Sequence, residues 1–365
     1  MNATNYSLQT AHSNRPWFKR PIFYFFLIVA LGVGYFSFRL GIAYNAISIY
    51  NGSWLSSIGR AILGEKQPEE NDPNPMPSPE PNRLDVLILG IRGTGQKEIE
   101  EEGGLLADTI LVASIDKTTK KAALVSIPRD FYIELAGVKG KINQIYERGL
   151  EQRQGLDLAK QIVSRVSGVY IDKAVVFDFN AFQHIVDTLG GVDINLAKPF
   201  REATQWGYEF SLPAGNNHLS GEQALYYVRS RFSTSDFDRA RRQQEVIVAI
   251  KNKAAQTSYL TNPLKITNLL SELKGDIRTD FQIWDIKDVI DLAGSFNPKS
   301  PTVGHAMSNS VSNSAMSNGA IKTYVLTYEN LLYESRTPKN EYILLPKGDN
   351  YDSVKLLFKE ILNSQ

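Results

Sequence analysis

A long apolar segment near the start of the chain restricts the possible folds more than any other feature. The run PIFYFFLIVALGVGYFSF, from Pro21 to Phe38, contains no charged residue, and a further apolar stretch follows Arg39. These 18 uncharged residues are just long enough to cross the hydrocarbon core of a bilayer as a helix. We therefore predict a transmembrane helix over residues 21–44.

The charges around this segment indicate its orientation. Residues 1–20 are polar and carry Arg15, Lys19 and Arg20, whereas almost no basic residue follows directly behind the segment. Basic residues collect on the cytoplasmic side, so we predict a cytoplasmic tail over 1–20 and an extracytoplasmic remainder, in a single-pass protein of the cell membrane. A cleaved signal peptide is the alternative, but the run is long and aromatic and lacks a clear A-x-A site.

A Pro-rich segment separates the predicted membrane helix from the rest of the chain. The sequence EKQPEENDPNPMPSPEPNR is rich in Pro, Glu and Asn and cannot build a core, so it is typical of an extended, semi-rigid spacer. We predict a juxtamembrane segment and stalk over 45–82, and a folded domain from residue 83.

The remainder alternates between strand-like and helix-like patterns. Apolar runs such as LDVLILGI, DTILVASID and KAALVSIP predict strands, and LDLAKQIVSRVSG and DRARRQQEVIVAIKNKAAQ have helical spacing. This alternation predicts an α/β fold, with a sheet covered by helices on both faces. We place the main domain over 83–260. Residues 261–365 continue the same domain with helices and strands, among them strands at KTYVLTY and EYILLP and a helix at YDSVKLLFKEIL, and they contain a Ser/Asn-rich surface loop over 301–320.

Composition excludes several classes of function. The chain has a net charge of +1, whereas a nucleic-acid-binding domain is usually basic. It has no cysteine, which excludes disulfides, iron–sulfur clusters and thiolate zinc sites. Its 4 histidines are widely spaced, which argues against a histidine zinc site.

Five arginines nevertheless stand close together in YVRSRFSTSDFDRARRQQ. Behind the SDFD turn, Arg239, Arg242 and Gln243 have the spacing of one helix face, and Arg229 and Arg231 can fold back toward the helix start. Guanidinium groups pair with phosphate oxygens in bidentate fashion, and a helix N-terminus adds partial positive charge. The stretch therefore predicts a diphosphate site. A solvated charged face with internal ion pairs is the alternative.

Charged residues at the ends of apolar strands are further candidates. In SIPRD, a strand run ends at Arg129 with Asp130 beside it, and ADTI places Asp108 at the start of another strand. GKIN offers Lys141 as a point charge. Because ligands of α/β proteins bind at the carboxyl ends of strands, Arg129 is predicted to be a second anion ligand. A purely structural role is the alternative for each of these residues.

The sequence offers no obvious nucleophile. It contains neither cysteine nor a G-x-S-x-G motif. GIRGTG, which includes Arg92, follows a strand and is similar to a phosphate-binding loop, but no GK[ST] follows it. We therefore expect electrostatic chemistry, in which phosphates are clamped with a divalent ion while a hydroxyl attacks.

Taken together, these motifs resemble those of the LytR–CpsA–Psr family. The segments LILGIRGTG, ADTILVASIDKTTKKAALVSIPRD, KINQIYERG, GGVDINL and HLSGEQALYYVRSRFSTSDFDRARRQQ occur in the order and spacing typical of that family. The resemblance implies an α/β/α sandwich with a mixed sheet. It also implies a membrane-anchored phosphotransferase that moves an anionic glycopolymer from a polyprenyl pyrophosphate carrier to peptidoglycan or another envelope acceptor, with a hydrophobic cavity for the lipid tail.

The resemblance also implies roles for individual residues. Asp108 would bind Mg²⁺, and Lys141 and Gln243 would stand near the pyrophosphate. The residues implied to grip the pyrophosphate are Arg129, Arg229, Arg231, Arg239 and Arg242.

Two positions depart from the family pattern. Arg92 stands where the family usually has an aspartate, and Leu106 stands where it usually has an arginine. Arg92 would then replace the lost guanidinium as a pyrophosphate ligand, and Mg²⁺ would be held more weakly by Asp108 alone among the carboxylates. The alternative function is a non-catalytic module that binds a polyprenyl phosphate or a wall polymer. A transcriptional regulator is disfavoured, because residues 1–20 are too few for a DNA-binding domain.

Overall fold

The computed structural model describes residues 72–93, 103–135, 137–257 and 321–363, together with residues 259, 265, 268–269, 272–273, 275–282 and 285. The predicted tail, membrane helix and first part of the stalk lie outside these residues, as does the loop over 301–320. Among the residues described, no helix is both long and apolar enough to cross a membrane.

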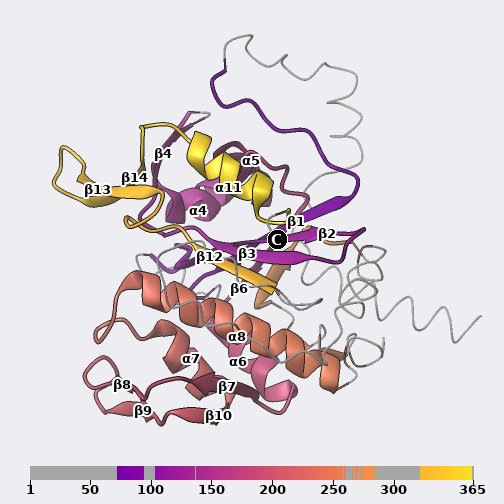
Figure 1. The fold of residues 1–365 in the computed structure, drawn as a ribbon, viewed down its shortest axis with the longest axis vertical. Coiled ribbons are helices and arrows are strands. Elements are labelled where there is room, and N and C mark those ends of the chain that lie inside the picture. Colours follow the sequence, from indigo (N-terminus) through magenta and orange to yellow (C-terminus); the bar gives the residue numbers. More distant parts are fainter. Residues whose placement is uncertain are drawn as a thin grey trace, which may run out of the picture.

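A six-stranded mixed sheet forms the centre of the molecule (Figure 1). β1 is parallel to β6 and antiparallel to β2, β3 is antiparallel to β2 and parallel to β12, and β11 is antiparallel to β6. The prediction of an α/β fold with a mixed sheet is confirmed. The strand order is β11 (Ile277–Thr279), β6 (Lys173–Phe177), β1 (Arg83–Gly90), β2 (Thr109–Asp116), β3 (Ala122–Ser126) and β12 (Ile321–Val325).

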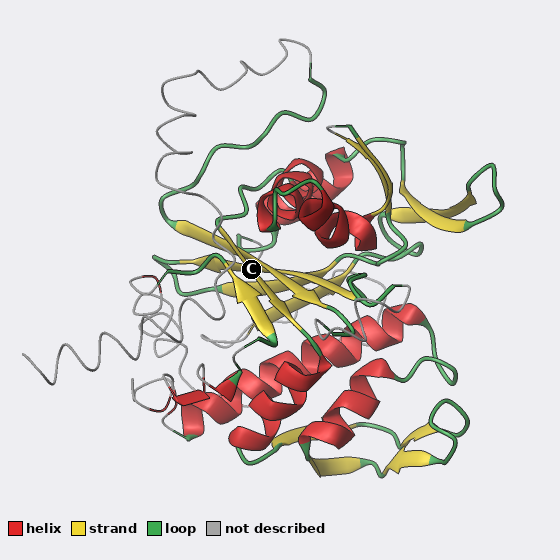
Figure 2. Ribbon diagram, turned by 180° about the vertical axis from the view of Figure 1, so that it is seen from behind, coloured by secondary structure: helices red, strands yellow, loops and turns green. Residues whose placement is uncertain are grey.

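Helices cover both faces of this sheet, which explains why its strands are apolar almost throughout. One layer contains α4 (Ile145–Glu151), α5 (Leu156–Ser167) and α11 (Asp352–Glu360). The opposite layer contains α6 (Phe179–Thr188), α7 (Gly221–Arg229) and α8 (Asp236–Gln256). Figures 1 and 2 show the sheet between these two layers.

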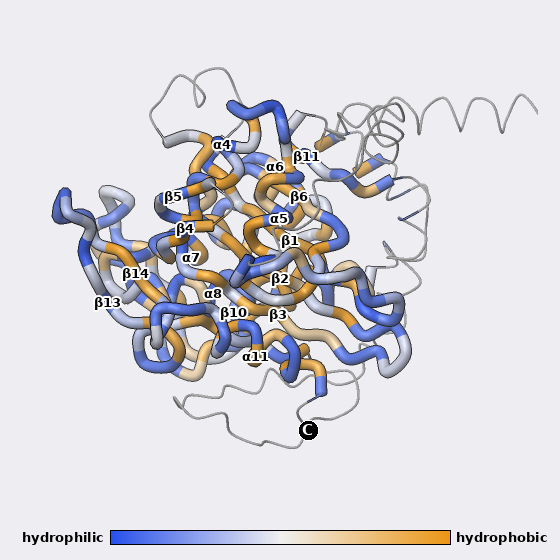
Figure 3. The backbone as a smooth tube through the Cα atoms, turned by 90° about the horizontal axis from the view of Figure 1, so that it is seen from above, coloured by the Kyte–Doolittle hydropathy of each residue, from blue (hydrophilic) through white to orange (hydrophobic). Residues whose placement is uncertain are grey.

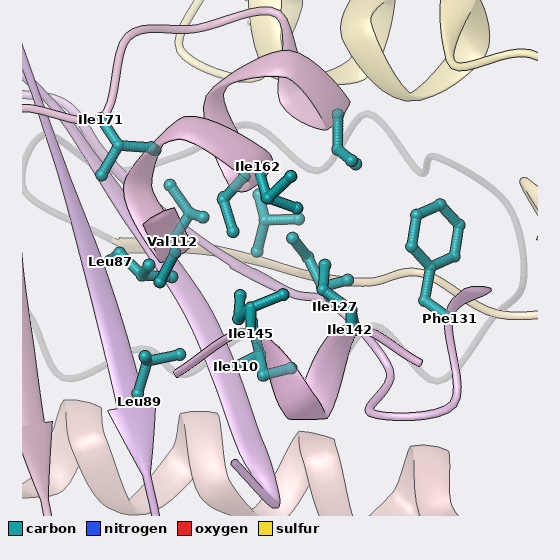
Figure 4. Close-up of a cluster of buried hydrophobic side chains, with 14 of the residues drawn as sticks. Leu87, Leu89, Ile110, Val112, Ile127, Phe131, Ile142, Ile145, Ile162 and Ile171 are labelled. Carbon is teal, nitrogen blue, oxygen red and sulfur yellow. The ribbon is translucent and has the colours of Figure 1, made fainter. Parts of the chain in front are cut away.

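The main core lies between the sheet and the first helix layer. Leu87 and Leu89 of β1 are fully buried there, and Ile162 of α5 packs into the same cluster (Figure 4). Burial of a side chain of this size contributes about 1.5–3 kcal/mol. A second cluster joins α6, α7 and α8 to the small sheets below them, which contain β7 (Val192–Leu196), β8 (Phe200–Glu202), β9 (Phe210–Leu212) and β10 (Gly215–Leu219).

Two further hairpins flank one end of the sheet. They are β4 (Tyr132–Leu135) with β5 (Val138–Lys141), followed by the 3-10 turn η2 (Ile142–Gln144), and β13 (Leu332–Arg336) with β14 (Tyr342–Pro346). Hairpin β13–β14 projects from the body, and its tip is hydrophilic (Figure 3). The sequence patterns predicted β14 and α11 but neither β13 nor the pair β4–β5.

The strand directions gather several chain segments at one edge of the sheet. β1 and β3 are both antiparallel to β2, so they run in the same direction as each other and as β6 and β12. The carboxyl ends of β6, β1, β3 and β12 therefore meet at one edge, together with the start of β2. This is the edge at which α/β proteins bind ligands.

Candidate functional site

A cavity of ≈ 190 Å³ opens at this edge. One part of its lining is apolar and comes from the end of β6 and from α6, α7 and α8. The residues of this part are Phe177, Phe179, Phe182, Leu225, Val228 and Ile247. The other part is charged and contains Arg92, Asp108, Arg129, Arg229, Arg231 and Arg239.

The cavity brings together seven of the nine predicted site residues: the six charged residues of the lining and Gln243. Arg92 follows β1, Asp108 precedes β2 and Arg129 follows β3, so that neighbouring strands place them side by side. The backbone N–H of Asp108 donates to the carbonyl of Gly90 at 3.0 Å, which fixes the start of β2 beside the end of β1.

Arg129 is the centre of the polar network in the cavity. Its Nη1 donates to Asp108 Oδ1 at 2.8 Å, and its Nε lies 3.3 Å from Asp236 Oδ2 and 3.6 Å from Asp130 Oδ2. Burial lowers the pKa of Arg129, but Asp236, Asp108 and Asp130 outweigh burial and raise it. Arg129 is therefore a fixed positive charge whose orientation is set by three carboxylates.

Arg239 approaches Arg129 from the first turn of α8. It is 7% exposed, and its Nη2 donates to Asp236 Oδ2 at 2.9 Å. Burial and the nearby Arg129 lower its pKa, while Asp236 opposes them. Two neighbouring guanidinium groups in a partly buried cavity repel each other, and a bound anion would relieve that repulsion.

Arg229 is held by aromatic rings. Its guanidinium lies 4.0 Å from the ring centroid of Phe179 and 5.1 Å from that of Trp206, which is cation–π distance. No carboxylate of the described residues forms an ion pair with Arg229. Burial lowers its pKa and the nearby Arg92 lowers it further, although an arginine stays protonated at any physiological pH.

The chain between α7 and α8 is fixed by the end of β8 and the segment that follows it. Glu202 is 1% exposed and accepts hydrogen bonds from the backbone N–H groups of Phe232 (3.1 Å) and Ser233 (3.2 Å). Gln205 donates to the carbonyl of Arg229 at 3.0 Å and accepts from the backbone N–H of Arg231 at 2.7 Å. These contacts place Arg229 and Arg231 at the cavity. Sequence reasoning missed Glu202 and Gln205, because no spacing pattern links them to the arginines.

Lys141 and Arg242 do not line the cavity. Lys141 Nζ donates to Asp130 Oδ1 at 2.6 Å. Lys141 therefore contacts the residue that follows Arg129 in the sequence. Arg242 is 7% exposed, and its guanidinium donates to the carbonyls of Tyr227 (2.9 Å) and Ser230 and to Thr234 Oγ1 (3.1 Å). Arg242 thus joins the end of α7 to the start of α8.

These environments predict opposite effects for two arginines of the same segment. Arg231→Ala should weaken the binding of inorganic pyrophosphate about tenfold and leave Tm unchanged, because the Arg231 side chain is exposed at the cavity. Arg242→Ala should lower Tm by roughly 5–10 °C, because it leaves buried carbonyls without a donor. Calorimetric titration and thermal unfolding of both variants measure this contrast. Equal Tm values for the two variants would contradict it.

The charge balance of the cavity determines what it can bind. Five arginines and one aspartate line it, and the apolar part of the lining adjoins them. This arrangement suits a ligand with a multiply charged anionic group attached to a hydrocarbon. Among the described residues, no three His, Cys, Asp or Glu side chains are grouped to hold a metal ion. Asp108, with its side chain 37% exposed, is the one carboxylate among the described residues of the lining.

Comparison with known proteins gives consistent results. Residues 55–334 match the model of the LytR_cpsA_psr family. The chain is 31% identical over 263 residues to the polyisoprenyl-teichoic acid–peptidoglycan teichoic acid transferase TagU of Oceanobacillus iheyensis. The aligned residues cover 68% of this chain and 76% of the relative. It is also 31% identical over 262 residues to TagU of Bacillus anthracis, covering 68% of this chain and 79% of the relative.

Solved structures share the fold. The crystal structure of B. subtilis TagV superimposes with a TM-score of 0.57 at 24% identity, covering 78% of this chain and 99% of TagV. The structure of TagT bound to LIIa-WTA gives a TM-score of 0.57 at 20% identity, covering 80% of this chain and 97% of TagT.

Proposed function

The chain belongs to the LytR_cpsA_psr family and is a transferase of phosphorus-containing groups, and from this premise we propose its reaction. The protein transfers an anionic glycopolymer from a polyprenyl pyrophosphate carrier to peptidoglycan or another envelope acceptor. We further propose that residues 21–44 anchor it in the cell membrane and that the domain from residue 83 works outside the cytoplasm. The name of the curated relatives, which act on polyisoprenyl-linked teichoic acid and peptidoglycan, supports the donor and acceptor classes.

The observation that carries the proposal is the two-part lining of the cavity. A polyprenyl pyrophosphate has a hydrocarbon chain on one end of a diphosphate. The five arginines would neutralise the diphosphate, and the apolar part beside Phe179 would receive the first units of the chain.

The chemistry is a phosphoryl-type displacement. The oxygen of an acceptor hydroxyl forms a new bond to the phosphorus that carries the polymer, and the bond from this phosphorus to the bridging oxygen breaks. Polyprenyl phosphate leaves and carries away the hydroxyl proton. The arginines stabilise negative charge that accumulates on the phosphate oxygens, and Arg129 is already oriented by Asp108, Asp130 and Asp236 before the substrate binds.

The residues present fit a Mg²⁺ ion that is shared with the substrate. Mg²⁺ is usually bound by one or two carboxylates together with phosphate oxygens and waters, rather than by an all-protein cage. Asp108 faces the cavity, and Arg129 occupies its Oδ1, which leaves Oδ2 for a cation. We propose that Asp108 holds this ion, which would supply further positive charge to the diphosphate.

A second candidate function is binding without transfer. Among the residues that the structure describes, only one carboxylate lines the cavity and could hold a metal ion. The five arginines would bind a diphosphate strongly without a metal ion. In this case the protein would retain a polyprenyl-linked polymer and release no lipid phosphate.

Product release tests the proposed function. We expect the full-length protein in lipid nanodiscs, supplied with a polyprenyl pyrophosphate-linked sugar and a soluble peptidoglycan oligosaccharide as acceptor, to release polyprenyl phosphate when Mg²⁺ is present, and to release much less in EDTA. Mass spectrometry of the lipid fraction measures this. Tight binding with no release in either condition would favour the second candidate and contradict transfer.

A further inference from the structure

The order of strands at the sheet edge gives the cavity a direction. The apolar lining stands at the end of β6 and on α6, α7 and α8, whereas Arg92, Asp108 and Arg129 stand at the ends of β1, β2 and β3 that face the cavity, and β12 is the next strand in line. A lipid diphosphate bound as proposed would therefore have its hydrocarbon chain toward β6 and its phosphates in the middle. The groups beyond β3 lie on the side away from the lipid.

Displacement at phosphorus constrains where the acceptor can bind. The attacking and leaving oxygens lie roughly in line on opposite sides of the phosphorus. Because the leaving group is the lipid phosphate, the acceptor hydroxyl has to approach from the side away from the apolar lining. In this sheet, that side is the carboxyl end of β12.

The chain that follows β12 presents an exposed aromatic residue there. Tyr328 comes three residues after the end of β12 and is 43% exposed. Its ring packs edge-on against Phe237 of α8, with centroids 5.2 Å apart. Phe237 directly follows Asp236, which pairs with both Arg129 and Arg239. Tyr328 thus packs against the residue that directly follows the carboxylate shared by Arg129 and Arg239.

A second exposed tyrosine comes from hairpin β13–β14. Tyr342 is 36% exposed, and its hydroxyl donates to Glu334 Oε1 at 2.9 Å. The hairpin is joined to the connection between β3 and β4 that carries Arg129, because the backbone N–H of Leu344 donates to the carbonyl of Asp130 at 2.9 Å. Burial and Glu334 raise the pKa of Tyr342, and Asp130 and Tyr328 add to this, as expected if these groups face one another.

We infer that Tyr328 and Tyr342 form the subsite for the acceptor sugar. An aromatic ring offers an apolar face to the C–H groups of a pyranose ring, and the neighbouring carboxylate of Glu334 can accept hydrogen bonds from sugar hydroxyls. A glycan strand lying on these tyrosines would direct one hydroxyl toward the phosphorus at Arg129. The inference rests on the proposed function, and it identifies the surface on which the acceptor sugar binds before the transfer.

The hairpin provides a matched control. In the register of β13 and β14, Tyr342 pairs with Arg336, whereas Tyr333 pairs with Leu345. Side chains alternate between the two faces of a strand, so Tyr333 lies on the face opposite to Tyr342. Tyr333→Ala removes a tyrosine from the same hairpin without touching the proposed subsite.

The experiment compares full-length Tyr328→Ala, Tyr342→Ala and Tyr333→Ala, each checked by thermal unfolding, with a soluble peptidoglycan oligosaccharide as acceptor. We expect the KM for the oligosaccharide to rise about tenfold in the first two variants and to stay at the parent value in Tyr333→Ala. The affinity for polyprenyl pyrophosphate should stay at the parent value in all three.

Two results would overturn the inference. One is an acceptor KM that changes less than twofold in both Tyr328→Ala and Tyr342→Ala. The other is an equal rise in Tyr333→Ala. If the parent protein releases no lipid phosphate, the proposed function fails, and direct binding of the oligosaccharide, followed by saturation-transfer NMR, then decides whether the tyrosines bind a sugar.

Discussion

Arg129→Ala should reduce the release of polyprenyl phosphate by about 10²–10³-fold, the loss expected when one preorganised donor is removed from developing anionic charge. The effect has two parts. The variant loses a guanidinium that lines the cavity, and it leaves Asp108, Asp130 and Asp236 without the cation that all three contact. These carboxylates would then repel the diphosphate.

The measurement is the initial rate of lipid phosphate release at saturating donor, together with donor affinity. Arg241→Ala is the control, since Arg241 is an arginine of α8 that is about half exposed and pairs with Asp238 outside the cavity. Arg241→Ala should retain the parent rate. A parent-like rate in Arg129→Ala would contradict the central role of Arg129 and favour the second candidate function.

Much of the site could be predicted from local patterns. The helix that carries Arg239 begins where the SDFD turn predicts it, because Ser235 and Asp238 form a capping box at the start of α8. Arg129 lies at the end of a strand that consists of apolar and small residues only, and Asp108 lies at the start of another. The sequence placed Arg129 at the carboxyl end of a strand, where α/β proteins bind ligands, but the start of β2 with Asp108 reaches the same edge only because β2 is antiparallel to β1 and β3.

Other parts depend on contacts between distant segments, which no local pattern contains. Arg242 has the spacing of a phosphate ligand, yet helix rotation turns it toward the carbonyls of Tyr227 and Ser230 rather than toward the cavity. Nothing in the sequence around Glu202 distinguishes it from an ordinary surface carboxylate. It is buried beneath the turn at Ser233 only because the fold brings these two segments together. Periodicity fixes which residues share a face but not which face meets the ligand.

The order of strands at the edge of the sheet could not be predicted from local patterns either. β12 occupies the position next to β3, although about 195 residues separate the two strands in the sequence. Pairing of such distant segments depends on tertiary packing. For this reason the neighbourhood of Tyr328, Tyr342 and Asp130 could be recognised only from the structure.

Asp108→Asn should reduce lipid phosphate release about 10²-fold and remove its dependence on Mg²⁺. The substitution keeps the shape of the side chain and an oxygen that can accept from Arg129, but it removes the only carboxylate charge among the described residues that line the cavity. Affinity for polyprenyl pyrophosphate in EDTA should rise, because the positive charge of the cavity is then less compensated. Opposite changes in turnover and affinity distinguish this variant from a misfolded one.

Asp236→Asn is the matched control for Asp108→Asn. Asp236 also pairs with Arg129, at 3.3 Å, but it is not part of the cavity lining. Asp236→Asn should therefore lower the rate while keeping its stimulation by Mg²⁺, whereas Asp108→Asn should lose that stimulation. The rate of release is measured against Mg²⁺ concentration for both variants. If Asp108→Asn kept a parent-like response to Mg²⁺, Asp108 would act only by orienting Arg129, and any metal ion would be held by the substrate alone.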